Sequence, residues 1–394
     1  MKKILISVLL MFILLFTSCE EEPDEQNVIP DVYTITSPYS NVNWATDGQF
    51  KAALHAHTSN SHNEVTATLT QIVDEHYKQD YDILALTDHN HIYGGLAQNP
   101  SPLNKDWVDN INPMTQARFD EVTTGVGRNS RGILPIPNTS ELLISPDEIN
   151  TYFFPHTLHA QNGEAALRNT LTQVQNAGGI AQMNHPGRVT GGSAIGAAGE
   201  AASNNPTWIN KYSGLFEDFP CLVGMEIINR NDADSRGDRI LWDNILKVII
   251  PKGQRNVWGF SNDDSHSTSA IGNSFNIFVM PENTLENVKS TMINGNFYAV
   301  TRTAGRELGN QFTGTGPTPT ITNIVITNNV STDATITITA ENVDVIKWIS
   351  NGVEIAEGAS ITLGSYADNI GVYVRANIIG SGGIVFTQPF IVTK

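Results

Sequence analysis

Short strand-like runs that end in polar, histidine-rich clusters recur along the chain. Four runs show this pattern, each with the cluster that follows it: Phe50–Ala53 before His55-Ala56-His57, Asp82–Thr87 before Asp88-His89, Ile180–Met183 before Asn184-His185, and Asn256–Phe260 before Asp264-Ser265-His266. Segments with apolar residues at helical spacing, such as Leu69–Tyr77 and Glu164–Ala177, lie between them. Strands that alternate with helices bring their carboxyl ends to one face of a barrel. The pattern predicts an α/β fold with the polar clusters gathered at that face.

The composition and the hydrophobic pattern of the sequence change after Gly305. Residues 306–318 are rich in Gly, Thr and Pro and predict a linker. Short alternating strands with turn residues such as Asn351-Gly352 then predict a small all-β, immunoglobulin-like sandwich over residues 319–394. The expected organisation is an α/β barrel over residues 46–305 followed by this β-sandwich.

The N-terminus has the pattern of an export signal. Lys2-Lys3, an apolar run and the small residues before Cys19 resemble a bacterial lipoprotein signal over residues 1–19. Lipidation of Cys19 would anchor the chain to a membrane, and an ordinary secretory signal is the alternative. Residues 20–45, with three prolines and many polar residues, predict a tether. We expect an exported outer-membrane lipoprotein that faces the periplasm or the cell surface.

Charge and cysteine content narrow the range of partners. The formal net charge is -17, which argues against a groove for long nucleic acids because phosphate backbones favour clustered Lys and Arg. A small anionic substrate remains compatible with this charge if metal ions supply local positive charge. The chain has two cysteines. With Cys19 in the anchor, Cys221 has no partner and is expected to be a buried apolar residue.

The histidines are confined to one part of the chain. All ten lie between His55 and His266, and only His76 falls on the apolar stripe of an expected helix. The other nine, with Asp88, Glu141 and Asp264 nearby, are too many for one tetrahedral structural zinc. Imidazoles and carboxylates together suit zinc, manganese or iron. The sequence predicts a site for two or three divalent ions.

The order of these motifs resembles that of the polymerase and histidinol phosphatase (PHP) family of metal-dependent phosphoesterases. The motifs that carry the resemblance are His55-Ala56-His57, Thr87-Asp88-His89-Asn90, Glu141, His185-Pro186 and Asp264-Ser265-His266. The similarity extends from about Phe50 to Ala304. It implies a distorted, TIM-like (βα)7 barrel with two or three metal ions at its mouth.

The resemblance also implies which side chains hold each ion. The first ion would be bound by His55, His57, Glu141 and Asp264. Glu141 would bridge to a second ion, bound by His185 and by either His156 or His159. The third ion would be bound by His89 and His266, with Asp88 and with His62, which stands where many relatives carry an aspartate.

The activity implied by the resemblance is hydrolysis of a phosphomonoester or a small phosphodiester by a hydroxide held between the ions that Glu141 bridges. Asp264 would take part as a ligand, Arg188 is a candidate phosphate contact, and His91 is a candidate for protonating the leaving alcohol. An exposed surface position is the alternative for Arg188 and His91. Two other functions stay open: a surface binding module with a metal-loaded barrel, and a metal-dependent hydrolase of a non-phosphate substrate.

Overall fold

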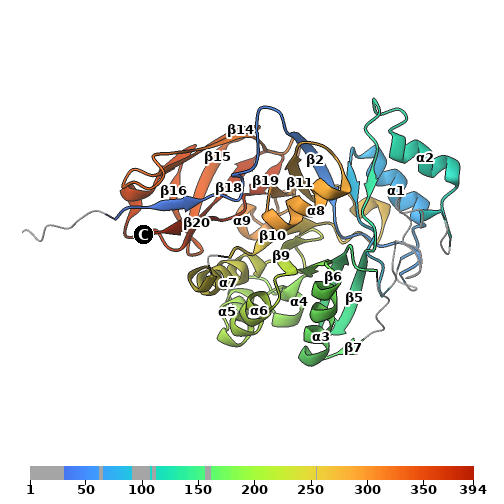
Figure 1. Cartoon of the computed structure of the whole chain (residues 1–394), viewed down its shortest axis with the longest axis horizontal. Coiled ribbons are helices and arrows are strands. Elements are labelled where there is room, and N and C mark those ends of the chain that lie inside the picture. The colour runs from blue at the N-terminus through green and yellow to red at the C-terminus, as the bar shows by residue number, and fades with distance from the viewer. Residues whose placement is uncertain (1–30, 62–64, 91–106, 109–111, 156–160, 254) are drawn as a thin grey trace, which may run out of the picture. The chain divides into compact units, whose positions relative to one another are not determined.

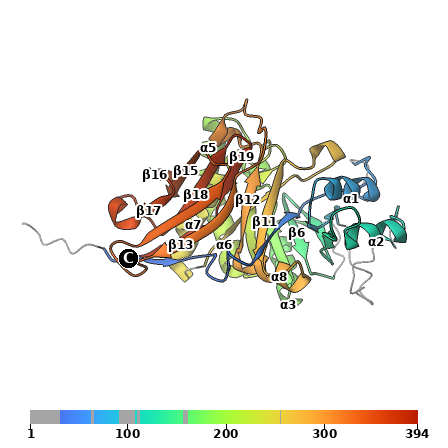
Figure 2. The ribbon, with the colours of Figure 1, turned by 90° about the horizontal axis from the view of Figure 1, so that it is seen from above.

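The computed structural model of the chain describes residues 31–394, except residues 62–64, 91–106, 109–111, 156–160 and 254. Within these ranges the fold is mixed α/β with three β-sheets, which confirms the predicted class at that level. Figure 1 labels the helices and strands, and Figure 2 shows them after a quarter turn.

The largest sheet contains strands from both the N-terminal and the C-terminal parts of the described chain. Its order is β1-β20-β18-β19-β12-β11-β2-β3-β4, with β15 paired to β18 and β16 paired to β15. The strands are β1 (Thr34–Thr36), β2 (Gly48–Ala53), β3 (Ile83–Leu84), β4 (Leu134–Pro135), β11 (Ser274–Met280), β12 (Phe297–Thr301), β15 (Val345–Ser350), β16 (Val353–Glu357), β18 (Tyr373–Gly380), β19 (Gly383–Phe386) and β20 (Phe390–Thr393). Strands β2, β3 and β4 are parallel, whereas β11 is antiparallel to β2 and β12.

Six strands form the second sheet, in the order β10-β9-β8-β6-β5-β7. They are β5 (Ser140–Ser145), β6 (Asp147–Tyr152), β7 (Gln161–Asn162), β8 (Ile180–Met183), β9 (Leu222–Asn229) and β10 (Trp258–Asn262). Strands β8, β9 and β10 are parallel, and β6 is antiparallel to both β5 and β8. A third, antiparallel sheet contains β13 (Thr320–Thr327), β14 (Thr335–Glu341) and β17 (Ser360–Thr362).

The helices begin and end at residues whose chemistry suits those positions. Thr68 forms a capping box with Gln71 at the start of the first helix, and Gly125 and Gly295 end two others in the left-handed conformation. The helices are α1 (Leu69–Lys78), α2 (Gln116–Thr124), α3 (Glu164–Asn176), α4 (Pro186–Thr190), α5 (Ala197–Ser203), α6 (Pro206–Asp218), α7 (Asp238–Gly253), α8 (Leu285–Asn294) and α9 (Gly305–Leu308). Figure 1 shows α3, α6 and α7 along the outer side of the second sheet. Within the described ranges, no helix has the length and apolar character that crossing a bilayer requires.

The two larger sheets share a hydrophobic core. Leu54 and Ile83 from the first sheet region pack in one buried cluster with Ile180, Val223 and Phe260 from the second. Two backbone bridges also link the sheets, between Ala56 and Ser265 and between His89 and Glu141. The bridges hold the carboxyl ends of β2, β3 and β10 and the amino end of β5 close together.

The strands of the predicted β-sandwich continue the largest sheet. Strand β19 is antiparallel to β12, with Ala299 opposite Phe386, and Figure 2 shows β18, β19, β12 and β11 in a row. The other face of the C-terminal strands packs on α7, where Tyr373 and Ile391 join a cluster with Trp242. The largest sheet therefore contains strands from both sides of residues 306–318, the segment predicted as a linker. The first residues of that segment belong to helix α9.

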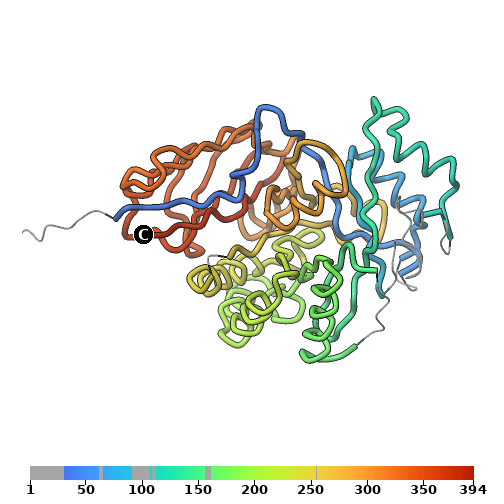
Figure 3. The backbone as a smooth tube through the Cα atoms, viewed as in Figure 1, coloured from blue at the N-terminus to red at the C-terminus, as the bar shows by residue number. Residues whose placement is uncertain are grey.

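Part of the predicted tether is folded, which corrects the sequence-based boundary. Strand β1 pairs with β20, and Figure 3 shows this N-terminal segment beside the C-terminal strands. Tyr33, Ile35 and Tyr39 are buried. A three-residue strand is too short to produce an alternating pattern, so periodicity missed it. Residues 20–30 lie outside the described residues.

Most predicted strands and helices lie within a few residues of their expected positions. Strand β8 matches its prediction, and α3 begins at the predicted Glu164 and ends one residue earlier than predicted. The chain forms two strands, β19 and β20, between Gly383 and Thr393, because Pro389 lacks a backbone N–H and interrupts the pairing before β20. Strand β16 was not predicted. Cys221 is buried and free, as expected.

Candidate metal centre

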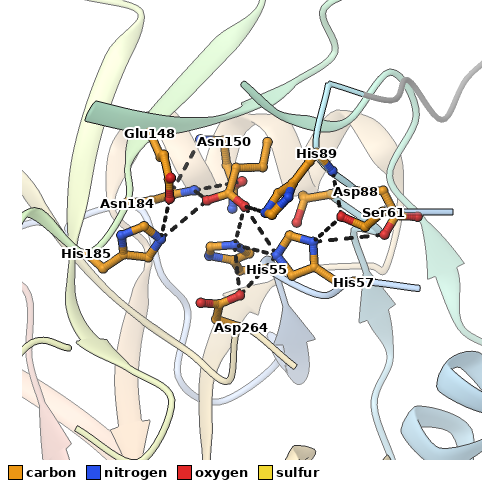
Figure 4. Close-up of polar contacts among 12 residues, drawn as sticks. His55, His57, Ser61, Asp88, His89, Glu148, Asn150, Asn184, His185 and Asp264 are labelled. Atoms are coloured by element: carbon orange, nitrogen blue, oxygen red, sulfur yellow. Dashed lines mark hydrogen bonds and ion pairs between the residues drawn. The ribbon is translucent and has the colours of Figure 1, made fainter. Parts of the chain in front are cut away.

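His55 and His57 extend from the end of β2 into the centre of the site. Their side chains lie on the same side of the chain because they are two residues apart in an extended segment. Both rings are buried, and their Nε2 atoms are 3.0 Å apart. Figure 4 shows the two rings between Asp264 on one side and His185 and His89 on the others.

Glu141 and Asp264 supply carboxylates to the same spot. Oε2 of Glu141 lies 3.3 Å from Nε2 of His55 and 3.2 Å from Nε2 of His57. Oδ1 of Asp264 lies 3.3 Å and 3.0 Å from the same two nitrogens. Asp264 follows β10 and Glu141 lies in β5, so one cluster combines residues from both large sheets.

His89 and His266 lie on one side of His57. Nε2 of His89 is 3.0 Å from Oε2 of Glu141, and both histidine rings pack against that of His57. Nδ1 of His266 is 2.9 Å from the carbonyl oxygen of Asp264. In the neutral ring this contact places the proton on Nδ1 and leaves the lone pair of Nε2 free for a ligand.

His185 and Glu148 lie on the opposite side. Nε2 of His185 is 3.3 Å from Oε1 of Glu141 and 3.3 Å from Oε2 of Glu148. His185 follows β8, and Glu148 is the second residue of β6. Glu148 did not stand out in the sequence, because no histidine or strand-end pattern surrounds it.

Buried partners behind the cluster fix the orientation of its side chains. Glu226 accepts a hydrogen bond from Nδ1 of His55 at 2.8 Å and from the backbone N–H of His185 at 2.9 Å. The side-chain amide of Asn184 donates to Oε1 of Glu141 at 2.7 Å. Such outer contacts set the tautomer and direction of metal ligands. Sequence reasoning missed Glu226, although a carboxylate within the apolar run of β9 is an unusual feature.

Three residues at the site have backbone φ angles that non-glycine residues rarely adopt. His185, Arg230 and Asp264 have φ angles of 23°, 56° and 44°, and none of them is glycine. Such conformations cost about 1–3 kcal/mol each and persist where the surroundings hold them. Their position at the ends of β8, β9 and β10 indicates that side-chain placement in the site outweighs local backbone preference.

The histidines and carboxylates of the cluster shift one another's pKa values. Burial opposes a charged ring, but the carboxylates of Asp264, Glu141 and Glu226 raise the pKa of His55 well above its usual value. The same competition raises the pKa of His57 to about 9. Burial also opposes the charge on Glu141, yet the surrounding imidazoles hold the pKa of Glu141 well below its usual value. The carboxylate of Glu141 therefore stays charged and attracts protons or metal cations.

The donor set fits divalent metal ions. Glu226 fixes the Nδ1 proton of His55, so in the neutral ring the Nε2 lone pair of His55 faces Nε2 of His57 and two carboxylates. One cation satisfies all four groups, whereas a proton between the two rings satisfies only part of them. Among the described residues, four groups have three ligand atoms within 4.8 Å of one another: His55-His57-Asp264, His57-His89-His266, Glu141-Glu148-His185 and His55-His185-Glu226.

A pocket of about 340 Å³ opens onto the cluster. Its lining comprises His89, Glu141, Leu143, Glu148, Arg188, Arg230, Asp264 and His266. Arg188 and Arg230 have side chains that are 43% and 39% exposed, so their guanidinium groups are accessible to a bound molecule. Nε of Arg230 donates to Oδ2 of Asp264 at 3.1 Å. Arg188 was expected from the sequence as a phosphate contact, and Arg230 was missed.

The remaining predicted site residues have different positions. Asp88 accepts hydrogen bonds from the backbone N–H and hydroxyl of Thr58, and its Oδ1 is 3.9 Å from Nδ1 of His57. This places Asp88 behind His57. Asp263, the neighbour of Asp264, accepts hydrogen bonds from the backbone N–H groups of Gly272, Asn273 and Ser274. Four predicted residues, His62, His91, His156 and His159, lie outside the described residues.

His76 is separate from the site, as expected. It is buried in α1, and Nδ1 donates to the carbonyl oxygen of Ile72 at 2.8 Å. Its ring packs edge-on against Tyr81. The apolar-stripe interpretation of His76 is therefore confirmed.

Comparisons with known proteins give matches among solved structures only. No family model and no curated protein matches the chain. One similar structure is a two-domain protein from Bacteroides vulgatus described as containing a predicted PHP-like metal-dependent phosphoesterase. The TM-score is 0.44 at 13% identity, and the match covers 89% of this chain and 88% of that one.

Two further solved structures overlap with a smaller part of the chain. PsfC from Pseudomonas syringae matches with a TM-score of 0.39 at 11% identity, over 62% of this chain and 88% of its own. The lesion-specific endonuclease PfuEndoQ from Pyrococcus furiosus matches with a TM-score of 0.37 at 13% identity, over 63% of this chain and 56% of its own. The order of the site motifs resembles that of the PHP family, and one of these three solved structures is described as PHP-like.

Proposed function

We propose that the chain is a metal-dependent phosphoesterase that hydrolyses a small phosphomonoester or phosphodiester. The observation that carries this proposal is the combination of a buried histidine and carboxylate cluster with two accessible arginines in one pocket. The cluster suits divalent cations, and guanidinium groups suit the oxygens of a phosphoryl group. A pocket of about 340 Å³ suits a small substrate.

The chain's own residues would bind and orient the substrate. Arg188 and Arg230 border the pocket and can donate N–H groups to phosphoryl oxygens, which offsets the negative charge that develops during the displacement. Asp264 holds Nε of Arg230, and this contact limits the directions in which the guanidinium can turn. The substrate phosphoryl group would therefore lie between two positive groups above the cluster.

The first ion would be held by His55, His57 and Asp264, and the third by His89 and His266 with His57. Glu141 would be shared between ions, since its two oxygens face different histidines. Divalent ions at such positions lower the pKa of a bound water and neutralise charge on the reacting phosphoryl group. The metals are proposed to be zinc, manganese or iron, and their number two or three.

We also propose a distorted barrel, a C-terminal sandwich and export as a lipoprotein. The bridges between Ala56 and Ser265 and between His89 and Glu141 join the two large sheets near the site, which supports a distorted barrel. The packing of the β13-β14-β17 sheet on β15 and β18 supports a sandwich over the C-terminal residues. Export as a lipoprotein through Cys19 rests on the N-terminal sequence, and loss of membrane association in Cys19→Ser would test it.

Activity assays on point variants test the proposed function. His55→Ala and Asp264→Ala each remove a central ligand, so hydrolysis of a generic phosphomonoester or phosphodiester should fall more than about a hundredfold, beyond what loss of an outer partner costs. Chelation should abolish wild-type turnover, and adding back manganese or zinc should restore it. Circular dichroism checks that the variants remain folded.

Glu354→Gln, on the exposed strand β16, is a matched control and should leave turnover unchanged. A panel of phosphomonoesters, dinucleotides and carboxyl esters then distinguishes the substrate class. Wild-type rates in folded His55→Ala and Asp264→Ala proteins would reject the proposal. Turnover of carboxyl esters alone would favour a non-phosphate hydrolase.

A further inference from the structure

We infer that Glu148 is a ligand of the second ion, together with Glu141 and His185, and that it makes this position richer in oxygen ligands than the first. Glu148 can act in this way only if the centre binds divalent ions, so the assignment rests on the proposed function. It differs from the ligand set implied by the motifs, in which His156 or His159 completes the second position.

The strand pairing places Glu148 on the same face of the sheet as Glu141. Glu141 in β5 lies directly opposite Asn150 in β6. Glu148 precedes Asn150 by two residues, so both side chains project from the same face. The backbone N–H of Asn184 donates to the carbonyl oxygen of Glu148 at 3.0 Å. This bond between neighbouring strands positions Glu148 beside His185.

The distances among the three side chains suit a shared cation. Nε2 of His185 is 3.3 Å from one oxygen of Glu141 and 3.3 Å from one oxygen of Glu148. Ligand atoms about 2.0–2.2 Å from one ion lie roughly 3–3.5 Å apart. Figure 4 shows Glu148 and His185 facing each other on the side of the cluster away from His57. All three ligand atoms lie within 4.8 Å of one another.

The alternative is that Glu148 serves only as the ion-pair partner of Arg188. The geometry argues that this ion pair does not fully explain the position of Glu148. Nη1 of Arg188 is 3.5 Å from Oε2 of Glu148, which is longer than the contact with His185. Exposed ion pairs of this kind contribute little to the stability of the folded state. Two neighbouring carboxylates that face one imidazole are also a donor set that a divalent cation binds, and an ion pair between Glu148 and Arg188 alone does not explain that arrangement.

The two positions would then differ in ligand chemistry. The first has two imidazoles, of His55 and His57, and the carboxylate of Asp264 in addition to the shared Glu141. The second has two carboxylates and one imidazole. Oxygen ligands suit manganese and magnesium, whereas imidazole suits zinc. The second position should therefore prefer manganese to zinc more strongly than the first does.

Direct measurement of ion binding tests this assignment without relying on turnover. The full chain is stripped of metal and titrated separately with Mn²⁺ and Zn²⁺ by calorimetry, and the bound ions are counted by elemental analysis after dialysis. We expect Glu148→Ala to weaken one Mn²⁺ site by at least about tenfold. Glu148→His should restore binding at that site with a shift toward Zn²⁺. Glu148→Gln, which keeps the shape and removes the charge, replaces Glu148→Ala if that variant does not fold.

Three controls separate the alternatives. Glu164→Gln, an exposed glutamate of α3, should leave binding unchanged. Arg188→Ala should keep the number of Mn²⁺ ions, which excludes a role of Glu148 confined to the ion pair. The double variant His156→Ala with His159→Ala should also keep that number.

Two results would overturn the assignment. One is unaltered Mn²⁺ number and affinity in Glu148→Ala and Glu148→Gln, and the other is loss of the ion in the double histidine variant but not in Glu148→Ala. If the wild type binds ions and hydrolyses phosphoesters under these conditions, the proposed function survives and only the assignment of Glu148 fails. A wild-type chain that binds no divalent ion would overturn both.

Discussion

Glu226 is a buried carboxylate with every oxygen occupied by hydrogen bonds. One oxygen accepts from Nδ1 of His55 and from the side chain of Asn262, and the other accepts from the backbone N–H of His185 and the side chain of Asn229. It therefore connects the ends of β2, β8 and β10 through one side chain. The pattern of histidines predicted the ligands that follow strands, but it could not predict Glu226 or Glu148. Their roles depend on which strands are neighbours, and neighbour order is not visible in a single sequence.

Substituting Glu226 should weaken metal binding without removing a ligand. In Glu226→Gln, an amide NH₂ replaces one carboxylate oxygen and faces hydrogen-bond donors, so either His55 loses the partner that fixes its tautomer or His185 loses its backbone anchor. We expect roughly a tenfold to hundredfold loss of metal affinity, measured by calorimetry. Glu200→Gln, an exposed glutamate of α5, should show no change. Equal affinity in Glu226→Gln and wild type would contradict this role.

Helix α1 illustrates how far periodicity alone predicts an element. Its buried residues are the ones expected from helical spacing, and its N-terminus is fixed by the capping box of Thr68 and Gln71. Amphipathic helices and buried runs such as β8 were predictable for this reason. Strand β1 was not, because it has three residues. The division between β19 and β20 does have a signal in the sequence, since Thr387-Gln388-Pro389 interrupts the apolar run. The extension of one sheet through β12 and β19 was also missed, since pairing between distant strands has no local signal.

The stability of the chain should depend on pH through His76 in this helix. Burial lowers the pKa of His76 to about 4, below its unfolded value of about 6.5. The unfolded state therefore binds more protons between these values, and stability falls as pH drops from about 6.5 to 4. The full shift corresponds to about 3 kcal/mol. Urea unfolding at several pH values should show a shallower decline for His76→Phe than for wild type. Parallel pH profiles for the two proteins would exclude this contribution.

At the scale of the whole molecule, a buried ion pair joins the C-terminal strands to the helix behind the second sheet. Arg375 in β18 makes two hydrogen bonds of 2.8 Å to the carboxylate of Asp243 in α7, and the hydroxyl of Tyr373 donates to the same carboxylate. Both charged side chains are almost fully buried. Together with the β12–β19 pairing, this contact makes residues 306–394 part of the structure that supports the site rather than an independent attachment.

Removing one charge of this ion pair should reduce the free energy of unfolding more than removing both charges does. Arg375→Met leaves Asp243 buried without its cation and should reduce the free energy of unfolding by about 3–5 kcal/mol. The double variant Asp243→Asn with Arg375→Met removes both charges and should be less destabilised. Thermal and urea unfolding of the two single variants and the double variant test this comparison. A double variant that is less stable than Arg375→Met would show that the buried charge is not the main cost.

The pairing of β1 with β20 also determines how the chain would respond to mechanical load. Strand β1 precedes β2 in sequence, and its three residues are held by Phe390–Thr393. Tension applied at residue 31 would therefore reach the C-terminal strands before it reached His55. The short β1–β20 contact would release first under such a pull, and the buried hydrogen bonds of Tyr39 to Phe297 and Gln388 would then have to break before β2 was loaded. The metal centre would keep its geometry during this first extension, which single-molecule pulling can follow as a separate early step.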